Sequence, residues 1–268
     1  MKIAILGANG FVGRSLAGYL LHNHHVTPVT RDTVDLLNPL AVRAYLEQNK
    51  FDIVINAAAV MTDASTLYDT RNNLGIYMNF FSNAHLFKRF INLASGAEYD
   101  RSTDINVATE HLIFQRMPQD SYGFGQNVKS RLSYQKHNFY NLRIFNCFGN
   151  GEANTRLFSK FISKQSDPVF EIQNDRYFDY FSIQDLCKVV EQFVTKEFIT
   201  VRDVNCVYPE KFKISQVLDK FCQINNLKSN FVVVSTSNNN YTGNGDVLKS
   251  LEIVLDGLEK GFKDYVHS

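Results

Sequence analysis

Short apolar runs alternate with longer amphipathic stretches in the first half of this chain. Runs of four or five mostly apolar residues, bounded by polar or turn-forming residues, are typical of buried strands. They fall at residues 3–6, 26–29, 53–56, 90–94 and 142–145. Between most of them, apolar residues recur at helical spacing, at residues 40–49, 74–87 and 128–137. This alternation predicts an α/β protein with a doubly wound, Rossmann-type parallel sheet covered by helices.

The pattern changes beyond residue 150, where the apolar runs become shorter. Strands are expected at residues 170–172 and 231–234, and helices at about 183–198 and 214–224. We therefore expect a Rossmann domain at residues 1–150 with returning elements at about 178–205. Residues 151–177 and 206–268 would form a smaller C-terminal substrate-binding lobe. The stretch 235–246 is rich in Ser, Asn, Thr and Gly, which predicts a mobile surface linker.

Composition excludes several classes of protein. A chain of 268 residues with 44% apolar residues can bury a core without disulfides or a metal. With 28 basic and 27 acidic residues, it has no overall field for nucleic acid or an anionic membrane surface. The four cysteines form no CxxC pair, no secretory leader precedes the first strand, and no stretch approaches the ~20 apolar residues of a membrane span. We expect a soluble protein of the reducing cytoplasm.

A glycine-rich turn joins the first strand to the first helix. It reads Gly7-Ala8-Asn9-Gly10-Phe11-Val12-Gly13. The glycines allow a tight turn, a close approach of the backbone to a pyrophosphate and close packing of helix on strand. The amides of the helix then face the anion. The motif predicts a dinucleotide site that includes Gly7, Asn9, Gly10, Phe11, Val12 and Gly13.

Further segments follow this turn in a characteristic order. They are Asn56-Ala57-Ala58-Ala59, Leu93-Ala94-Ser95-Gly96-Ala97-Glu98-Tyr99, Ser121-Tyr122-Gly123-Phe124-Gly125-Gln126 and Leu142-Arg143-Ile144-Phe145-Asn146-Cys147-Phe148-Gly149. With them, residues 1 to about 186 resemble the extended short-chain dehydrogenases/reductases of the nucleotide-sugar epimerase, dehydratase and reductase type. Residues 30–37 and 51–58 are most similar to the GDP-fucose synthases and dTDP-4-dehydrorhamnose reductases.

The resemblance implies the catalytic residues. Tyr122 would exchange a proton with the sugar oxygen while hydride moves to or from the nicotinamide, and Ser95 would hydrogen-bond the same oxygen. The family's lysine, four residues after the tyrosine, is replaced by Gln126. Glutamine can hold the nicotinamide ribose but supplies no positive charge beside the phenol. Lys129, two helical turns from Tyr122, is too far away to substitute.

The resemblance also implies the cofactor contacts. Arg31 stands after the second strand, where an arginine suits a ribose 2′-phosphate, although the neighbouring Asp32 favours a 2′-hydroxyl. NADP(H) is therefore preferred and NAD(H) is possible. Asp35 and Leu36 would flank the adenine, and Ala57, Ala58 and Ala59 would line the same site.

Two absences narrow the reaction. Gly96 and Ala97 occupy the places where a dehydratase has an acid pair, and Ala97 also replaces the cysteine used in epimerisation by GDP-fucose synthase. The resemblance then implies NADPH-dependent reduction of a nucleotide-activated 4-keto-6-deoxy sugar, in the synthesis of cell-surface polysaccharide precursors. Asn146, Arg156 and Arg176 are expected near the sugar nucleotide. A nucleotide-sugar 4-epimerase and a catalytically weak NAD(P)-binding regulatory or partner protein remain as alternatives.

The remaining candidates are a metal site and a subunit contact. His22, His24 and His25 form a cluster without an accompanying carboxylate or cysteine, so no metal is expected. The family suggests a homodimer through the helices at 74–87 and 128–137.

Overall fold

The computed structural model describes residues 1–60, 66–164 and 169–265. Within these residues, six parallel strands form the main sheet in the order β10-β6-β4-β3-β1-β2. Their bounds are β1 Lys2–Leu6, β2 His25–Val29, β3 Ile53–Asn56, β4 Arg89–Ser95, β6 Phe139–Ile144 and β10 Asp203–Cys206. The expected Rossmann-type parallel sheet is confirmed. The strand expected at residues 142–145 begins three residues earlier than predicted.

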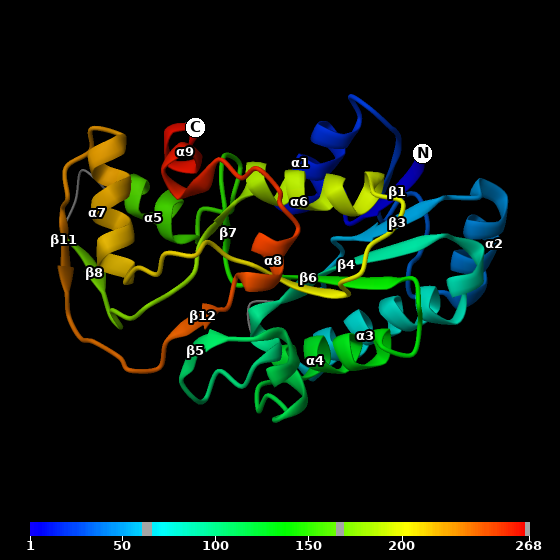
Figure 1. The fold of residues 1–268 in the computed structure, drawn as a ribbon, viewed down its shortest axis with the longest axis horizontal. Coiled ribbons are helices and arrows are strands. Elements are labelled where there is room, and N and C mark those ends of the chain that lie inside the picture. Colours follow the sequence, from blue (N-terminus) through cyan, green and yellow to red (C-terminus); the bar gives the residue numbers. More distant parts are fainter. Residues whose placement is uncertain (61–65, 165–168, 266–268) are drawn as a thin grey trace.

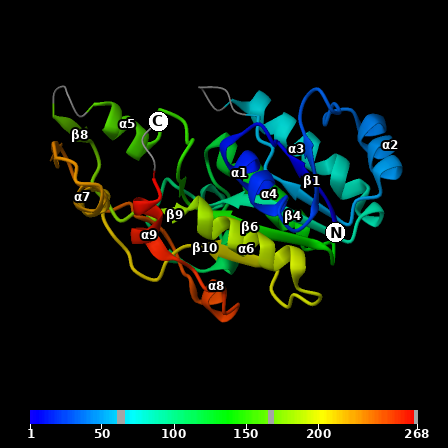
Figure 2. The same cartoon turned by 90° about the horizontal axis from the view of Figure 1, so that it is seen from above.

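Helices cover both faces of this sheet (Figures 1 and 2). Helices α1 (Phe11–Leu20) and α6 (Ile183–Thr195) lie on one face, and α2 (Pro39–Asn49), α3 (Leu67–Ser82) and α4 (Ser121–Ser133) lie on the other. Alternate residues of β1 serve the two layers. Ile3 and Ile5 pack in the cluster of α1 and α6, whereas Ala4 and Leu6 pack in the cluster of α2 and α3.

Helices α3 and α4 begin earlier than expected. Helix α3 starts after Thr66, whose side chain forms a capping box with Asp69, and α4 starts after the N-cap Asp120. In the first turn of α3 the buried residues are Asp69 and Thr70, and in the first turn of α4 only Gly123 is buried. Apolar spacing could not show these turns, because neither of them buries a large apolar side chain.

Much of the remaining chain packs around aromatic side chains beyond one end of the sheet. Its elements are β7 Cys147–Phe148, α5 Leu157–Ser163, β8 Phe170–Ile172, β9 Phe181–Ser182, α7 Ile214–Ile224, β11 Phe231–Val233 and α9 Gly257–Lys263. Phe158, Phe221 and Phe262 are completely or almost completely buried at its centre. Leu248 of α8 (Asp246–Ser250), expected in the second lobe, packs instead in the cluster of α1 and α6.

The expected surface linker at residues 235–246 contains a buried strand, so that prediction was wrong there. Strand β12 (Tyr241–Gly243) is buried and pairs in parallel with β5 (Ile105–Ala108). Figure 1 shows the two strands side by side below the end of the main sheet. Local composition gave no sign of this strand because its ladder partner lies far away in the sequence.

Short 3₁₀ segments complete the fold at η1 Ala84–Leu86, η2 Gly96–Glu98 and η3 Glu110–Phe114. Among the helices that the structure describes, none has the length and apolar character to cross a bilayer.

Candidate active site

The glycine turn brings α1 and β1 unusually close to the end of β3. Gly7 has a φ of +73°, and a Cβ there would lie 2.7 Å from the Cα of Ala58. A Cβ on Gly13 would lie 2.3 Å from the carbonyl oxygen of Gly7. The N-cap of α1 is Gly10, which supplies no side-chain cap, so the first amides of the helix remain available to an anion. This cradle fits the pyrophosphate of a dinucleotide.

A cavity of about 1140 Å³ opens over this turn at the carboxyl ends of β1, β2 and β3. Its walls include twelve residues expected at the cofactor: Gly7, Asn9, Gly10, Phe11, Val12, Gly13, Arg31, Asp35, Leu36, Ala57, Ala58 and Ala59. Gln126, expected at the nicotinamide ribose, is not among the residues that line it. Tyr68 and Asn72 from α3 also line it, as do Ala153 and Arg156 from the second half of the chain. Tyr68 and Asn72 were missed because the start of that helix was not recognised, and Ile76 of α3, which also lines the cavity, was not assigned to it either.

Ser95 and Tyr122 come together from different elements. Ser95 ends β4 and caps the 3₁₀ turn η2 by accepting a hydrogen bond from the amide of Ala97, at 3.1 Å. Tyr122 lies in the first turn of α4, which packs against η2. Burial raises the pKa of the Tyr122 phenol, while hydrogen bonding to Ser95 lowers it. The structure thus brings together the two hydroxyls that the motifs predict to act on the sugar oxygen.

Gln126 lies one helical turn beyond Tyr122 and is buried. Hydrogen bonding between its side chain and the phenol lowers the pKa of Tyr122. Its Oε1 atom is buried and finds no hydrogen-bond donor within the described part of the chain. An unsatisfied buried acceptor is costly, so a hydroxyl donor supplied by a ligand would fit at this atom. A ribose hydroxyl is such a donor.

Two further side chains that the sequence did not predict lie near Tyr122. The guanidinium carbon of Arg101 lies 5.9 Å from the centroid of the Tyr122 ring, and its charge lowers the pKa of Tyr122. Tyr241 of β12 is buried, and this burial raises the pKa of its phenol well above the usual range. Hydrogen bonding to Ser95 lowers that pKa in part. No local motif marks either residue, because both reach the site only through long-range folding.

A buried ion network supports the turn behind Ser95. Glu98 accepts a hydrogen bond from the amide of Ser95 at 3.4 Å and an ion pair from Arg143 at 2.7 Å. Arg143 also pairs with Asp203 of β10 at 3.0 Å. Arg143 and Glu98 are completely buried, and burial raises the pKa of Glu98 despite the arginine charge. The network ties η2 to β6 and β10, which fixes the backbone that presents Ser95.

The three residues expected at the sugar nucleotide surround the buried side chain of Tyr180. Asn146 hydrogen-bonds to Tyr180 and accepts a hydrogen bond from Arg156 at 2.9 Å. The charge of Arg176 also acts on Tyr180, and Arg176 donates to the carbonyl of Asn239 at 2.9 Å. The Nε atom of Arg176 is buried without a hydrogen-bond acceptor in the described residues. The structure therefore gathers two cations around one tyrosine, and one of them has an unused donor.

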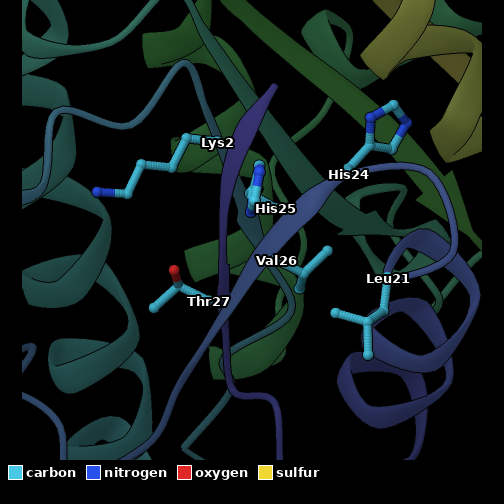
Figure 3. A pocket seen from close by; sticks show the side chains of 6 residues that line it. All are labelled: Lys2, Leu21, His24, His25, Val26 and Thr27. Carbon is cyan, nitrogen blue, oxygen red and sulfur yellow. The ribbon is translucent and has the colours of Figure 1, made fainter.

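The histidine cluster lies away from this site, at the amino ends of β1 and β2. Figure 3 shows His24 and His25 among six side chains that line a separate cavity of about 550 Å³. Their rings lie apart and do not converge on a common point (Figure 3). Within the described residues, no group of three or more His, Cys, Asp or Glu side chains is placed to hold a metal.

The chain resembles proteins of known function in sequence and in fold. A family model described as the NAD dependent epimerase/dehydratase family matches residues 3–206. A GDP-6-deoxy-D-talose 4-dehydrogenase from Aggregatibacter actinomycetemcomitans is 24% identical over 84% of this chain and 80% of its own length.

Two solved structures share the fold over nearly the whole chain. One is a GDP-mannoheptose C4 reductase from Campylobacter jejuni with NADP bound, with a TM-score of 0.79 and 19% identity over 98% of this chain and 96% of that one. The other is a UDP-glucuronic acid 4-epimerase mutant from Bacillus cereus in complex with a fluorinated sugar nucleotide and NAD, with a TM-score of 0.78 and 18% identity over 98% and 97%. The family that the sequence motifs resemble is confirmed: the chain belongs to the NAD dependent epimerase/dehydratase family and is an NAD(P)-dependent oxidoreductase of that family.

Proposed function

We propose that this protein reduces the ketone of a nucleotide-activated 4-keto-6-deoxy sugar with NADPH. The observation that carries the proposal is the pair of Tyr122 and Ser95, hydrogen-bonded at the carboxyl end of β4. A parallel sheet of this type binds its ligands at the carboxyl ends of its strands. The large cavity opens at the neighbouring ends of β1, β2 and β3.

The side chains account for the proton transfer. Tyr122 donates its phenolic proton to the ketone oxygen as the carbon accepts a hydride, and the resulting phenolate regains a proton from solvent. Ser95 hydrogen-bonds the same oxygen and stabilises the charge that develops on it. The nicotinamide supplies the hydride when the cofactor is bound. The free Oε1 atom of Gln126 would accept a hydrogen bond from the ribose that carries the nicotinamide.

The cofactor preference rests on Arg31. Arg31 lines the cavity beside Thr30, just after β2. Its delocalised positive charge would pair there with a 2′-phosphate. Asp32 lines the same cavity and favours a 2′-hydroxyl, so NAD(H) would be accepted less well. The C. jejuni reductase of the same fold was solved with NADP.

The substrate class is supported by the cations around Tyr180. Arg156 and Arg176 would bind the diphosphate of a sugar nucleotide, and the free Nε of Arg176 is a suitable donor. The two reductase-type relatives are named for reactions at C4 of GDP-sugars. We place the reaction in the cytoplasm, in the synthesis of cell-surface polysaccharide precursors.

Reduction can be tested directly with purified protein. NADPH and NADH are each mixed with a panel of 4-keto-6-deoxy sugar nucleotides, and the absorbance of the reduced cofactor is followed. We expect oxidation of NADPH, faster than that of NADH, and its loss by at least a hundredfold in Tyr122→Phe. Tyr177→Phe, a change at an exposed tyrosine, is the control and should retain full activity. No oxidation across the panel would refute the proposal.

A 4-epimerase is the second candidate, supported by the shared fold with the B. cereus epimerase. Such an enzyme keeps its cofactor through turnover and consumes no external hydride. Mass spectrometry of the protein after native purification would then find tightly bound NAD(P), and C4 epimers would interconvert without added NADPH.

A cofactor-binding regulatory or partner protein is the third candidate, because Gln126 carries no charge. Gln126→Lys separates it from an enzyme. A large gain in rate would indicate an enzyme, whereas an inactive protein that binds cofactor and stays inactive would indicate a binding role.

A homodimer through α3 and α4 is also proposed. Met78 of α3 and Phe124 of α4 are large apolar side chains that remain 37% and 42% exposed, which suits a helix-to-helix contact between copies. Analytical ultracentrifugation should show a dimer that Phe124→Glu dissociates.

A further inference from the structure

Tyr122 faces an unusual set of charges for a residue that exchanges protons. It is half-buried, and burial raises the pKa of its phenol, while the neighbouring Gln126 cannot supply a cation. Glu98, behind Ser95, raises its pKa further. Tyr241, the other phenol at Ser95, is more deeply buried than Tyr122. A positive charge is needed near this phenol if it is to release a proton at neutral pH.

Arg101 lies where such a charge is needed. Its guanidinium carbon is 5.9 Å from the centroid of the Tyr122 ring. The charge of Arg101 acts on both Tyr122 and Tyr241, and it lowers the pKa of each. Lys129, although on the same helix as Tyr122, is held near Glu98 instead. Arg176 lies farther along, near Tyr241 and Arg101.

Two sets of contacts hold Arg101 in place. Its guanidinium forms a two-pronged ion pair with Asp120, with N–O distances of 2.7 and 3.3 Å. Asp120 is in turn fixed as the N-cap of α4, because it accepts a hydrogen bond from the amide of Gly123 at 2.7 Å. The preceding residue Asp100 closes a turn by accepting from the amide of Ser102 at 3.1 Å. Arg101 is thus anchored to the helix that carries Tyr122.

We infer that Arg101 is a positioning residue that supplies the positive charge beside the Tyr122 phenol, which Gln126 cannot supply. Its role rests on the proposed function, since a phenol needs this charge only if it exchanges protons. When Tyr122 gives its proton to the ketone oxygen, the phenolate that forms is stabilised by the guanidinium. Asp120 neutralises part of this charge, but it also keeps the guanidinium over the ring.

The test compares charge-removing and charge-keeping variants. Arg101→Gln should slow ketone reduction at pH 7 about tenfold, and should move the pH profile of the reverse oxidation to higher pH, because that direction needs the phenolate. Arg101→Lys should keep most of the rate and the wild-type profile. Arg43→Gln, which removes an exposed arginine paired with Glu47, is the matched control and should change neither. Unchanged profiles in Arg101→Gln would overturn the inference.

A rescue experiment separates charge from structure. Adding Gln126→Lys to Arg101→Gln should return the profile toward lower pH, because the new ammonium lies one turn from Tyr122. If Arg101 served only to hold the loop, Arg101→Lys, which cannot form the two-pronged pair with Asp120, would shift the profile as far as Arg101→Gln, and the inference would fail.

The phenol can also be titrated without turnover. The holoprotein is labelled with ¹³Cζ-tyrosine, and the Tyr122 signal is identified among the 13 tyrosines as the one lost in Tyr122→Phe. Its pKa should rise in Arg101→Gln even if no sugar is reduced. A shifted signal without any turnover would refute the proposed function alone, whereas an unshifted signal would refute the role of Arg101.

Discussion

Gly13 and Gly18 lie on the same helix but in very different surroundings. A Cβ on Gly13 would lie 2.3 Å from the backbone oxygen of Gly7, whereas a Cβ on Gly18 would meet no atom within 4 Å. Gly13→Ala should therefore push α1 away from the turn and destabilise the protein by about 2 kcal/mol or more, with weaker cofactor binding. Urea unfolding and titration with NADPH would measure both effects.

Gly18→Ala is the built-in control for that change. Alanine loses less conformational entropy than glycine in a helix, so this variant should gain about 0.5–1 kcal/mol and bind NADPH normally. If Gly13→Ala and Gly18→Ala had the same stability and the same affinity for NADPH, the close approach at Gly13 would be unimportant.

Helix α4 contains a buried lysine that serves neither the cofactor cavity nor Tyr122. Lys129 is 3% exposed, and burial lowers its pKa to about 8, with Glu98 opposing the change. Because the folded state holds this proton less tightly than the unfolded state, stability is lost as pH falls from 10.5 through 8. Lys129→Met should remove this penalty and stabilise the protein at pH 7 by about 3 kcal/mol.

The pH dependence makes the Lys129 prediction specific. The advantage of Lys129→Met should shrink as pH rises above 8, because the wild-type lysine then becomes neutral in the fold. Chemical unfolding of both proteins at pH 7 and pH 9.5 measures it. A constant difference between the two proteins would indicate a packing effect instead.

At the level of elements, the sequence predicted whatever depends on local pattern. The runs of apolar residues located five of the six strands of the main sheet, all except β10, and the glycine turn located the cavity beside α1. The pair of Ser95 and Tyr122 was found because each stands in a recognisable motif. The polar first turns of α3 and the strand β12 were missed, because their burial depends on partners distant in sequence.

The same distinction explains which site residues were missed. Arg101 lies in an ordinary polar turn, and Tyr241 follows a run of asparagines. Arg101 precedes β5 by four residues, and Tyr241 lies in β12, the strand that pairs with β5. A motif shows which side chains stand at a fixed spacing on one element. Charged side chains that approach from other elements can be identified only in the folded structure.

Across the whole molecule, one ion pair connects the segments that bring Tyr241 to the site. Asp179 accepts ion-paired hydrogen bonds from Lys211 at 2.8 and 3.0 Å, and a hydrogen bond from the amide of Gly243 at 2.8 Å. Burial raises the pKa of Asp179 to about 6, although Lys211 lowers it. The pair therefore joins β12 to the segments around residues 179 and 211.

Removing one member of this ion pair should destabilise the protein more than removing both. Asp179→Asn leaves the mostly buried Lys211 ammonium without its carboxylate and should cost about 3 kcal/mol of stability, with Lys211→Met similar. The double variant should recover most of that loss, since neither charge is then unpaired. Glu47→Gln, which breaks the exposed pair with Arg43, should change stability little. A double-mutant cycle by urea unfolding measures the coupling, and additive losses would show that the two charges act independently.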